Sequence, residues 1–340
     1  MSSLIDTETI GGWVAGLDIG ARAPITFTRV GAGQSNLTFL VEDADGRRWV
    51  LRRPPLGSLL ASAHDVAREH RIMAALVGTG VPIPLPHALC TDPTITDAPI
   101  MLMEHVAGVV VDSMTSVEAI DPQRRSAIGH SLARTLGAVH AVDLDATGLS
   151  DLASRRPYAE RQLRRWHRQW EDSRTRDLPL VDDLATRLSA RIPEQVDVTL
   201  VHGDFHLMNV ITSIGDGAVR AVLDWELSTL GDPLADLGGL LAYWPQADDS
   251  VVPGFAGPTL PGFPSRDDLV QVYADSSGRD VDGVDFWHVL GLWKIAIIAE
   301  GVLRRSLDEP RNTATTGRVD AAVVDGLLRR ADEEARAGGW

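Results

Sequence analysis

The chain has 340 residues and a mass of 36.7 kDa, and its 44% hydrophobic and 23% charged residues exclude a mainly disordered protein. Its 32 basic and 47 acidic residues give a formal net charge of −15, which disfavours nonspecific binding to nucleic acid or to an anionic membrane. Cys90 is the single cysteine, so an intrachain disulfide and a cysteine-cluster metal site are also excluded.

We expect neither a targeting segment nor a membrane span. The first 21 residues contain no Lys or Arg, and no apolar run follows them that could act as a signal peptide. No stretch approaches about 18 uninterrupted apolar residues, the length that spans a bilayer. The sequence therefore predicts a cytoplasmic protein without membrane or nucleic-acid partners, and it leaves the oligomeric state open.

The first hundred residues are predicted to be rich in strands. Strands are expected within residues 26–53, where Leu37, Phe39 and Val41 fall on one face of an alternating segment. A helix is expected over residues 64–77, because its apolar residues recur on one side. The segment Ile100–Met103 has the pattern of a buried strand.

The rest of the chain is predicted to be mainly helical. Asp121 and Pro122 form a good helix start, and that helix is expected to run to about residue 140. Further helices are expected over 157–173 and 287–305, and short strands over 198–201, 208–212 and 219–223. The boundary between the two halves falls near residues 104–108, and a ligand cleft between such halves is the usual arrangement.

The strongest functional signal is the octapeptide at residues 202–209, His-Gly-Asp-Phe-His-Leu-Met-Asn. It comes just after a predicted strand. Asp204 is followed five residues later by Asn209, and Asp224 comes fifteen residues after that, again at a strand end. Phosphoryl transfer needs one carboxylate to orient the attacking hydroxyl, and a carboxylate and an amide oxygen to hold Mg²⁺ against the phosphates. The spacing matches that requirement.

With these motifs the chain resembles the aminoglycoside phosphotransferase and choline kinase-like family, relatives of the protein kinases. The resemblance implies that Asp204 is the catalytic base, that Asn209 and Asp224 bind Mg²⁺, and that Asp232 and Asp236 support the catalytic loop. It also implies a bilobal α+β protein-kinase-like fold, with a small strand-rich N-lobe over 1–106 and a larger, mainly helical C-lobe over 107–340.

A zinc site is the alternative interpretation of the same segment. His202 and His206 are four residues apart, a spacing that suits two ligands on one helix face. The segment is predicted to be a loop, however, and no third ligand is evident in the sequence.

The first half offers candidates for binding the nucleotide. Gly31, Gly33 and Ser35 lie in a turn between predicted strands, where backbone N–H groups can cradle phosphates, although a Gly-x-Gly turn is also common without any ligand. The next strand carries Val50 and Arg52 on one face. In protein kinases that strand supplies a lysine, but the only lysine of this chain is Lys294, so Arg52 is expected to meet the phosphates while Val50 covers the adenine.

The guanidinium group of Arg52 needs a carboxylate partner. Glu69 shares the apolar face of the predicted helix, so it is expected either to pair with Arg52 or to be a partly exposed surface residue. The resemblance places Met103 behind the adenine and assigns its hydrogen bonds to the Glu104 carbonyl and the Val106 amide. The ending Leu-Arg-x-Pro-Pro after Val50 resembles the branch of kinase-like domains joined to acyl-CoA dehydrogenases.

The sequence gives less information about the site that binds the phosphate acceptor. Residues 155–176 contain eight arginines and three acidic residues, which suits either an anionic substrate or a solvated helix face. The Pro- and Gly-rich loop after Tyr243 and Trp244 is expected to border the acceptor pocket. Lys294 either contacts the substrate or extends out of an apolar helix.

The sequence thus predicts an ATP- and Mg²⁺-dependent small-molecule kinase that phosphorylates an alcohol. The acceptor is left open between an anionic compound such as a hydroxyacyl-CoA and an aminoglycoside or amino alcohol. The alternative is a catalytically weak, nucleotide-binding regulatory partner in acyl-CoA metabolism. A protein kinase ranks lower, because the interval between Asp224 and Asp232 leaves no room for a long activation segment.

Overall fold

A computed structural model describes residues 4–30, 36–55, 65–153, 157–308 and 319–340. The chain forms two compact units, which are described separately: Met1–Ala107 with Arg220–Glu226, and Gly108–Val219 with Leu227–Trp340. The segment Arg220–Glu226 therefore belongs to the first unit, whereas the sequence interpretation included it in the second lobe.

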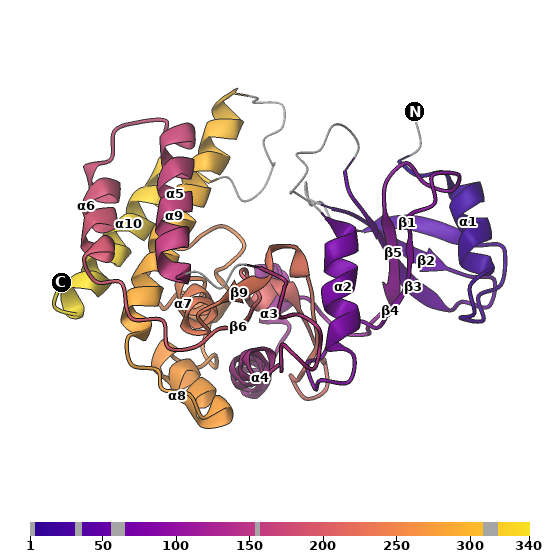
Figure 1. The fold of residues 1–340 in the computed structure, drawn as a ribbon. Helices are drawn as coiled ribbons and strands as arrows, with labels where there is room; N and C mark the ends of the chain where they lie inside the picture. Colours follow the sequence, from indigo (N-terminus) through magenta and orange to yellow (C-terminus); the bar gives the residue numbers. More distant parts are fainter. Residues whose placement is uncertain (1–3, 31–35, 56–64, 154–156, 309–318) are drawn as a thin grey trace. The chain divides into compact units, whose positions relative to one another are not determined.

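The first unit is built on a five-stranded antiparallel sheet with the strand order β1-β2-β3-β5-β4 (Figure 1). Its elements are α1 (Thr7–Ala15), β1 (Thr26–Val30), β2 (Leu37–Glu42), β3 (Arg48–Arg53), α2 (Val66–Leu76), β4 (Pro86–Cys90) and β5 (Ile100–Glu104). Asp6 and Asp65 cap the N-termini of α1 and α2 with their side chains, which explains where these helices begin.

The two faces of this sheet carry different side chains. Phe39 and Val41 of β2 and Leu51 of β3 are buried with Ile10 and other residues of α1 in one apolar core. Because side chains alternate along a strand, Val50 and Arg52 point to the opposite face. Helix α2 packs on β4 and β5, on the other side of the sheet from α1 (Figure 1). The alternation of β3 thus separates the core from a polar face.

The second unit is mainly helical. Its larger helices are α4 (Pro122–His140), α5 (Tyr158–Ser173), α6 (Pro179–Ser189), α7 (Leu234–Ala242), α8 (Arg266–Ser277), α9 (Val284–Asp308) and α10 (Ala321–Ala337), with the short helix α3 (Met114–Glu118). Its short elements are β6 (Thr199–Val201), η1 (Leu207–Asn209), β7 (Val210–Thr212), β9 (Thr229–Gly231) and η3 (Gly257–Thr259), while β8 (Val219–Val222) and η2 (Trp225–Leu227) span the division between the units. Strands β6 and β9 pair antiparallel.

Helix α9 is the centre of this unit and packs against α5, α7 and α10. By length and composition it could cross a membrane, but 78% of its 18-residue apolar window is buried inside the protein, as in a core helix. Gly238 of α7 and Gly291 of α9 allow the two helices to approach closely: an added Cβ on Gly291 would lie 2.9 Å from the Gly238 carbonyl oxygen. This close crossing fixes the position of the next turn of α9.

The helices predicted from the sequence are present, whereas α1, α6, α8 and α10 were not predicted. The helix expected over 64–77 is Val66–Leu76, and the one expected over 157–173 is Tyr158–Ser173. The strand expected over 208–212 is shorter, because residues 207–209 form a 3₁₀ turn before β7 begins.

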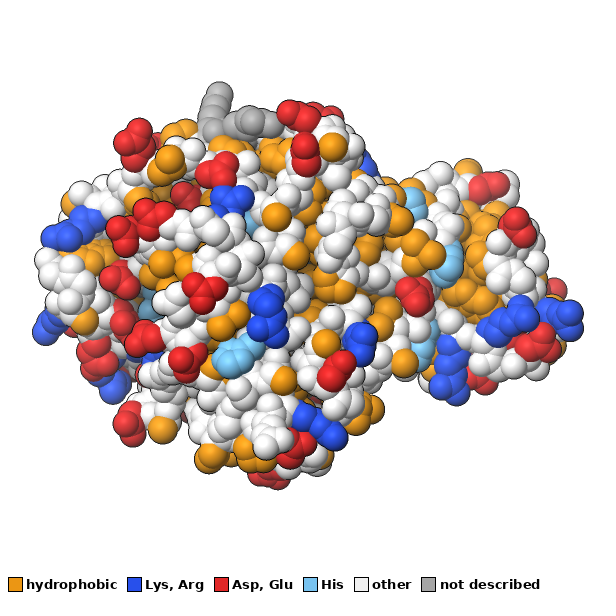
Figure 2. All heavy atoms as spheres, turned by 90° about the horizontal axis from the view of Figure 1, so that it is seen from below, with side chains coloured by type: hydrophobic (Ala, Val, Ile, Leu, Met, Phe, Trp, Pro, Cys, Tyr) orange, Lys and Arg blue, Asp and Glu red, His pale blue; other side chains and the backbone are white. Residues whose placement is uncertain are grey.

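Acidic and basic side chains are interspersed on the face drawn in Figure 2.

Candidate active site

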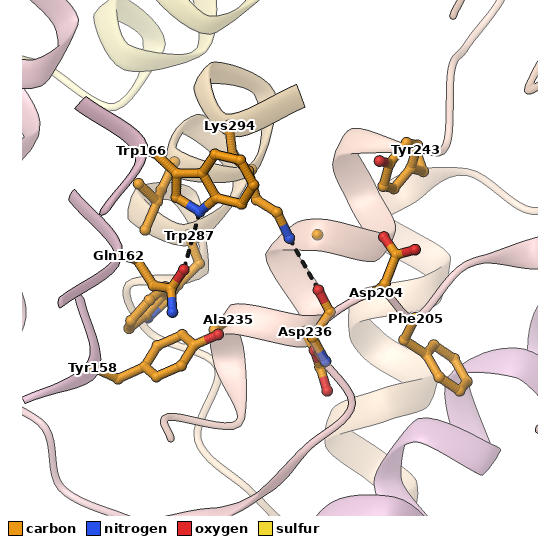
Figure 3. Close-up of a pocket in the computed structure, with 14 residues that line it drawn as sticks. Tyr158, Gln162, Trp166, Asp204, Phe205, Ala235, Asp236, Tyr243, Trp287 and Lys294 are labelled. Carbon is orange, nitrogen blue, oxygen red and sulfur yellow. Dashed lines mark hydrogen bonds between the residues drawn. The ribbon is translucent and has the colours of Figure 1, made fainter. Parts of the chain in front are cut away.

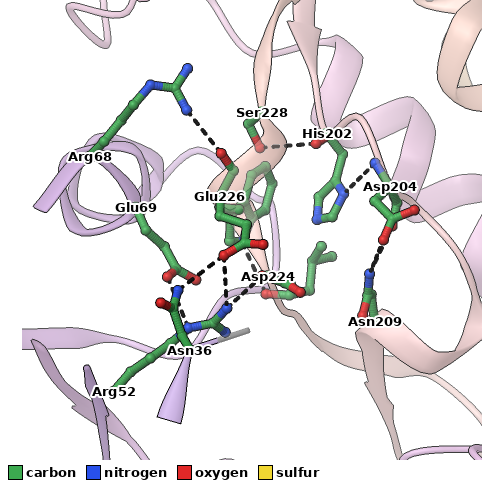
Figure 4. Close-up of polar contacts among 12 residues, drawn as sticks. Asn36, Arg52, Arg68, Glu69, His202, Asp204, Asn209, Asp224, Glu226 and Ser228 are labelled. Carbon is green, nitrogen blue, oxygen red and sulfur yellow. Dashed lines mark hydrogen bonds and ion pairs between the residues drawn. The ribbon is translucent and has the colours of Figure 1, made fainter. Parts of the chain in front are cut away.

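In the first unit, Arg52 lies among three carboxylates (Figure 4). Its Nε lies 3.1 Å from Glu69 Oε2, and its Nη2 lies 2.5 Å from Asp224 Oδ1 and 3.8 Å from Glu226 Oε2. The side chains of Arg52 and Glu69 are 11% and 1% exposed, so this pair is almost fully removed from water. The structure therefore forms the pair of Arg52 and Glu69 that the sequence indicated.

The local charge changes the proton affinity of the buried carboxyl. Burial raises the pKa of Glu69 to about 7; Arg52 opposes this shift, and the negative charges of Asp224 and Glu226 add to it. For Arg52, burial works against the charged form, but Glu69 and Asp224 outweigh it and raise the pKa of the guanidinium. The Arg52 guanidinium is thus shared among three carboxylates.

Asp224 and Glu226 follow β8 in a sharply turned segment. Asp224 has a φ of +66°, a left-handed conformation that Asp tolerates better than most residues. The Glu226 side chain accepts a hydrogen bond from Asn36 Nδ2 at 3.1 Å, and its backbone carbonyl accepts one from Arg68 Nη1 at 3.3 Å. Neither Glu226 nor Asn36 was predicted as a site residue. The position of Glu226, two residues after Asp224, could have indicated that it belongs to the site.

The other nucleotide candidates lie along β3 and β5. Val50 and Met103 are direct cross-strand partners, which puts their side chains on the same face of the sheet. Glu104 is exposed, with its backbone N–H donating to the Leu85 carbonyl at 2.8 Å, and Val106 is half-buried in the segment that follows. Gly31, Gly33 and Ser35 lie outside the described residues.

In the second unit, hydrogen bonds to backbone N–H groups hold the segment after β6 in place. The Asp236 carboxylate accepts hydrogen bonds from the backbone N–H groups of His202 at 2.6 Å and Gly203 at 2.8 Å, and it lies 3.3 Å from His140 Nε2. Gly203 has a φ of +86°, and an added Cβ would lie 2.8 Å from the Leu227 carbonyl oxygen, so glycine is required here. Asp232 instead accepts from the backbone N–H of Leu234 at the start of α7.

These contacts place the Asp204 carboxylate beside two side chains of its own loop. Its Oδ2 lies 3.2 Å from His206 Nε2, and Asn209 Nδ2 donates to the same oxygen at 3.2 Å and to the Asp204 carbonyl at 2.9 Å (Figure 4). Burial raises the pKa of Asp204, but the hydrogen bond and charge of His206 and the charge of Lys294 outweigh it and hold the pKa well below its usual range. Asp204 is therefore an ionised acceptor.

Asp204 lines a pocket that lies within the second unit (Figure 3). Tyr158, Trp166, Tyr243 and Trp287 contribute aromatic surface to its walls. Its polar side chains include Gln162, Asp236 and Lys294 besides Asp204. A mostly apolar cavity with a few convergent polar groups is the usual form of a small-molecule site.

Most of these cavity residues were missed from the sequence, although two patterns could have revealed them. Tyr158, Gln162 and Trp166 are spaced four apart on α5, and Trp287, Gly291 and Lys294 are spaced four and then three apart on α9, so each set forms one helix face. Helix α5 therefore presents its aromatic face to the cavity, while Trp170 is buried in the core.

The two predicted magnesium ligands lie in different units, Asn209 in the second and Asp224 in the first. Within the described residues, no group of three or more His, Cys, Asp or Glu side chains is arranged to hold a metal ion, so the zinc alternative gains no support. Mg²⁺ bound with phosphates needs only one or two protein oxygen ligands. Asn209 uses its amide nitrogen toward Asp204, which turns its amide oxygen away, and the Asp224 side chain is 30% exposed.

Comparison with known proteins gives a consistent result. The family model described as phosphotransferase enzyme family matches residues 26–269. Acyl-CoA dehydrogenase family member 10 from Mus musculus is 38% identical over 296 residues, which cover 86% of this chain and 28% of that protein. The chain spans between 28% and 38% of the length of the curated relatives that it matches.

Solved structures share the whole fold. A crystal structure from Ralstonia eutropha JMP134, provisionally described as an aminoglycoside phosphotransferase, matches with a TM-score of 0.77 at 32% identity and covers 98% of this chain and 97% of that one. A thermostable mutant of aminoglycoside phosphotransferase APH(4)-Ia, in a ternary complex with ADP and hygromycin B, matches with a TM-score of 0.62 at 15% identity and covers 98% and 99%. The fold class predicted from the sequence is confirmed.

Proposed function

The chain belongs to the phosphotransferase enzyme family, and we propose that it transfers the γ-phosphoryl group of ATP to a hydroxyl group of a small molecule. The observation that carries the proposal is the Asp204 carboxylate: it is ionised, held by its own loop, and open to a cavity with apolar walls. A general base needs all three properties, because it must accept a proton from a bound hydroxyl out of bulk water.

In the proposed reaction, the acceptor hydroxyl donates its hydrogen bond to Asp204. The hydroxyl oxygen forms a bond to the γ-phosphorus, the bond from that phosphorus to the bridging oxygen of ADP breaks, and the hydroxyl proton moves to Asp204. The products are the phosphorylated alcohol and ADP. Asp236 supports the step by holding the His202 and Gly203 backbone that carries Asp204.

The first unit would bind the nucleotide. Arg52, oriented by Glu69, would contact the phosphates, and Val50 and Met103 would cover the adenine from one face of the sheet. The Glu104 carbonyl and the Val106 amide would supply the hydrogen bonds to the base. Asn209 and Asp224 would hold Mg²⁺, which neutralises charge on the β- and γ-phosphates when it is bound.

One observation favours a second candidate, a nucleotide-binding protein without transferase activity. Arg52, which replaces the usual lysine, forms an ion pair of 2.5 Å with Asp224, the proposed metal ligand, and binding of the metal has to compete with that contact. In this case the protein would bind ATP and act as a regulatory partner, in keeping with relatives that are named as acyl-CoA dehydrogenase family members.

The test is a mass-spectrometric search for products that gain one phosphate, with ATP, Mg²⁺ and a library of hydroxyacyl-CoAs, amino alcohols, hydroxy acids and aminoglycosides. For the product found, Asp204→Asn should lower kcat by about 100- to 10,000-fold. Asp172→Asn, the same change at an exposed position of α5, should leave kcat unchanged. Tight ATP binding with no product from any alcohol would support the regulatory candidate instead.

A further inference from the structure

Lys294 is the only lysine of the chain, and its ammonium group points into the cavity that Asp204 lines (Figure 3). It donates a hydrogen bond to the Gly203 carbonyl at 2.9 Å, and it lies 5.5 Å from the centre of the Trp166 ring. Of the described residues that line this cavity, Lys294 is the one with a positively charged side chain.

The ammonium group has hydrogen-bonding capacity to spare. It carries three N–H donors, and for the described residues the structure gives it one acceptor, the Gly203 carbonyl. Asp236 also lines the cavity, but its carboxylate already accepts from two backbone N–H groups and contacts His140. The ammonium group is partly buried and has two N–H donors left, so an acceptor oxygen placed against it in this cavity would be favourable.

The second polar group beside Lys294 is also a donor. The Gln162 side-chain oxygen accepts a hydrogen bond from Trp166 Nε1 at 3.0 Å, which leaves the NH₂ group of the amide for the cavity. Tyr158 and Trp287 supply flat apolar surface next to it. The cavity therefore has two carboxylates, Asp204 and Asp236, and two donor groups, those of Lys294 and Gln162. The Asp236 carboxylate is already bound by backbone N–H groups, so the Lys294 end of the cavity suits an oxygen atom and disfavours an ammonium group placed against it.

We propose that Lys294 selects and orients the phosphate acceptor by binding a second oxygen next to the reacting hydroxyl. The inference rests on the proposed function and adds a substrate class to it. The acceptor is an alcohol with an anionic or uncharged oxygen acceptor close to its hydroxyl and with an apolar body, which packs on the aromatic wall. Alcohols with an ammonium group near the hydroxyl are rejected by the charge of Lys294.

A merely structural Lys294 would hold Gly203 and do nothing else. The test therefore measures the preference among ligands rather than activity alone. Three probes share one skeleton and differ beside the hydroxyl: mandelate is anionic, mandelamide is neutral, and 2-amino-1-phenylethanol is cationic. Their binding to the full chain is followed by tryptophan fluorescence, without nucleotide or metal, since Trp166 and Trp287 line the cavity.

The wild-type protein should bind mandelate more tightly than mandelamide, and mandelamide more tightly than 2-amino-1-phenylethanol. In Lys294→Met, the Kd for mandelate should rise by about 10-fold or more, while the Kd for the cationic probe should fall or stay the same. Lys294→Arg should keep the order of the three probes, because it keeps the charge. Arg168→Met, which removes a positive charge from an exposed position of α5, should change none of the three values.

The inference is overturned if the wild type binds the cationic probe as tightly as mandelate, if it binds none of the three, or if Lys294→Met weakens all three equally. An equal loss would mean that Lys294 only holds the loop, and thermal unfolding of the variant would show whether the fold is retained. The binding assay does not depend on transfer. The absence of any phosphorylated product would count against the proposed function, whereas the order of the three Kd values decides the role of Lys294.

Discussion

Two carboxyl groups, the buried Glu69 of the first unit and the half-buried Asp204 of the second, have pKa values that their surroundings shift in opposite directions. Glu69 lies beside one cation and two further carboxylates, and its pKa rises to about 7. Asp204 lies beside His206, Asn209 and the charge of Lys294, and its pKa falls below its usual range.

Burial disfavours the charged form of both groups, so burial alone cannot distinguish them. The difference comes from the balance of neighbouring charge and donors. In the first unit, the five N–H donors of one arginine are shared among several carboxylates. In the second unit, donors converge on a single carboxylate. The arrangement around Glu69 suits a site that binds a further cation. The arrangement around Asp204 suits a base that is ionised before the substrate binds.

The largest expected effect follows from removing the shared cation. Arg52→Met leaves Glu69 and Asp224 without their main partner, which should lower the free energy of unfolding of the first unit by about 3–5 kcal/mol at pH 8. The loss should be smaller at pH 5, because Glu69 can then take up a proton. Hydrogen exchange of peptides from β3 and α2, followed by mass spectrometry, measures this unit separately. An equal loss at both pH values would contradict the assignment of the effect to Glu69.

The second expectation concerns the wild-type protein and the pH. Because folding raises the pKa of Glu69 from 4.5 to about 7, the folded state binds the proton more tightly than the unfolded state. The free energy of unfolding of the first unit should therefore fall by roughly 3 kcal/mol as the pH rises from 4.5 to 7. Glu69→Gln should remove this dependence in hydrogen exchange of α2.

The contribution of Asp204 should have the opposite sign in the same experiment. The stabilisation from Asp204 is fully present above pH 3.8, its ordinary value, and is lost as the pH falls further. Peptides around residues 202–209 should thus lose protection only in acid. A common pH profile for both units would mean that the two carboxyl groups do not control their surroundings as the structure indicates.

Much of the fold and part of the site could be predicted, because they depend on short-range patterns. The alternation in β3 correctly placed Val50 and Arg52 on one face, and the position of Glu69 on the apolar face of α2 correctly indicated a buried partner for Arg52. Both inferences needed only the periodicity of one element and the cost of burying a charge.

The remainder depends on how distant elements pack, which no local pattern shows. The position of Lys294 beside the Asp204 loop follows from the close crossing of α7 and α9 at Gly238 and Gly291, which are far apart in the sequence. Likewise, the sequence left Asp224 and Glu226 without a link to Arg52, because their inclusion in the first unit is a property of the tertiary structure.

The smallest expected effect tests whether surplus negative charge is what distinguishes Glu69. Glu226→Gln removes one negative charge but keeps an oxygen that can accept from Asn36, so it should lower the pKa of Glu69 and reduce the pH-dependent loss of stability by about 1 kcal/mol. Glu42→Gln, the same change in an exposed ion pair of the same unit, should leave the loss unchanged. If both variants keep the wild-type pH profile in hydrogen exchange of α2, burial alone sets the pKa of Glu69, and the contrast with Asp204 must then come from the donors around Asp204.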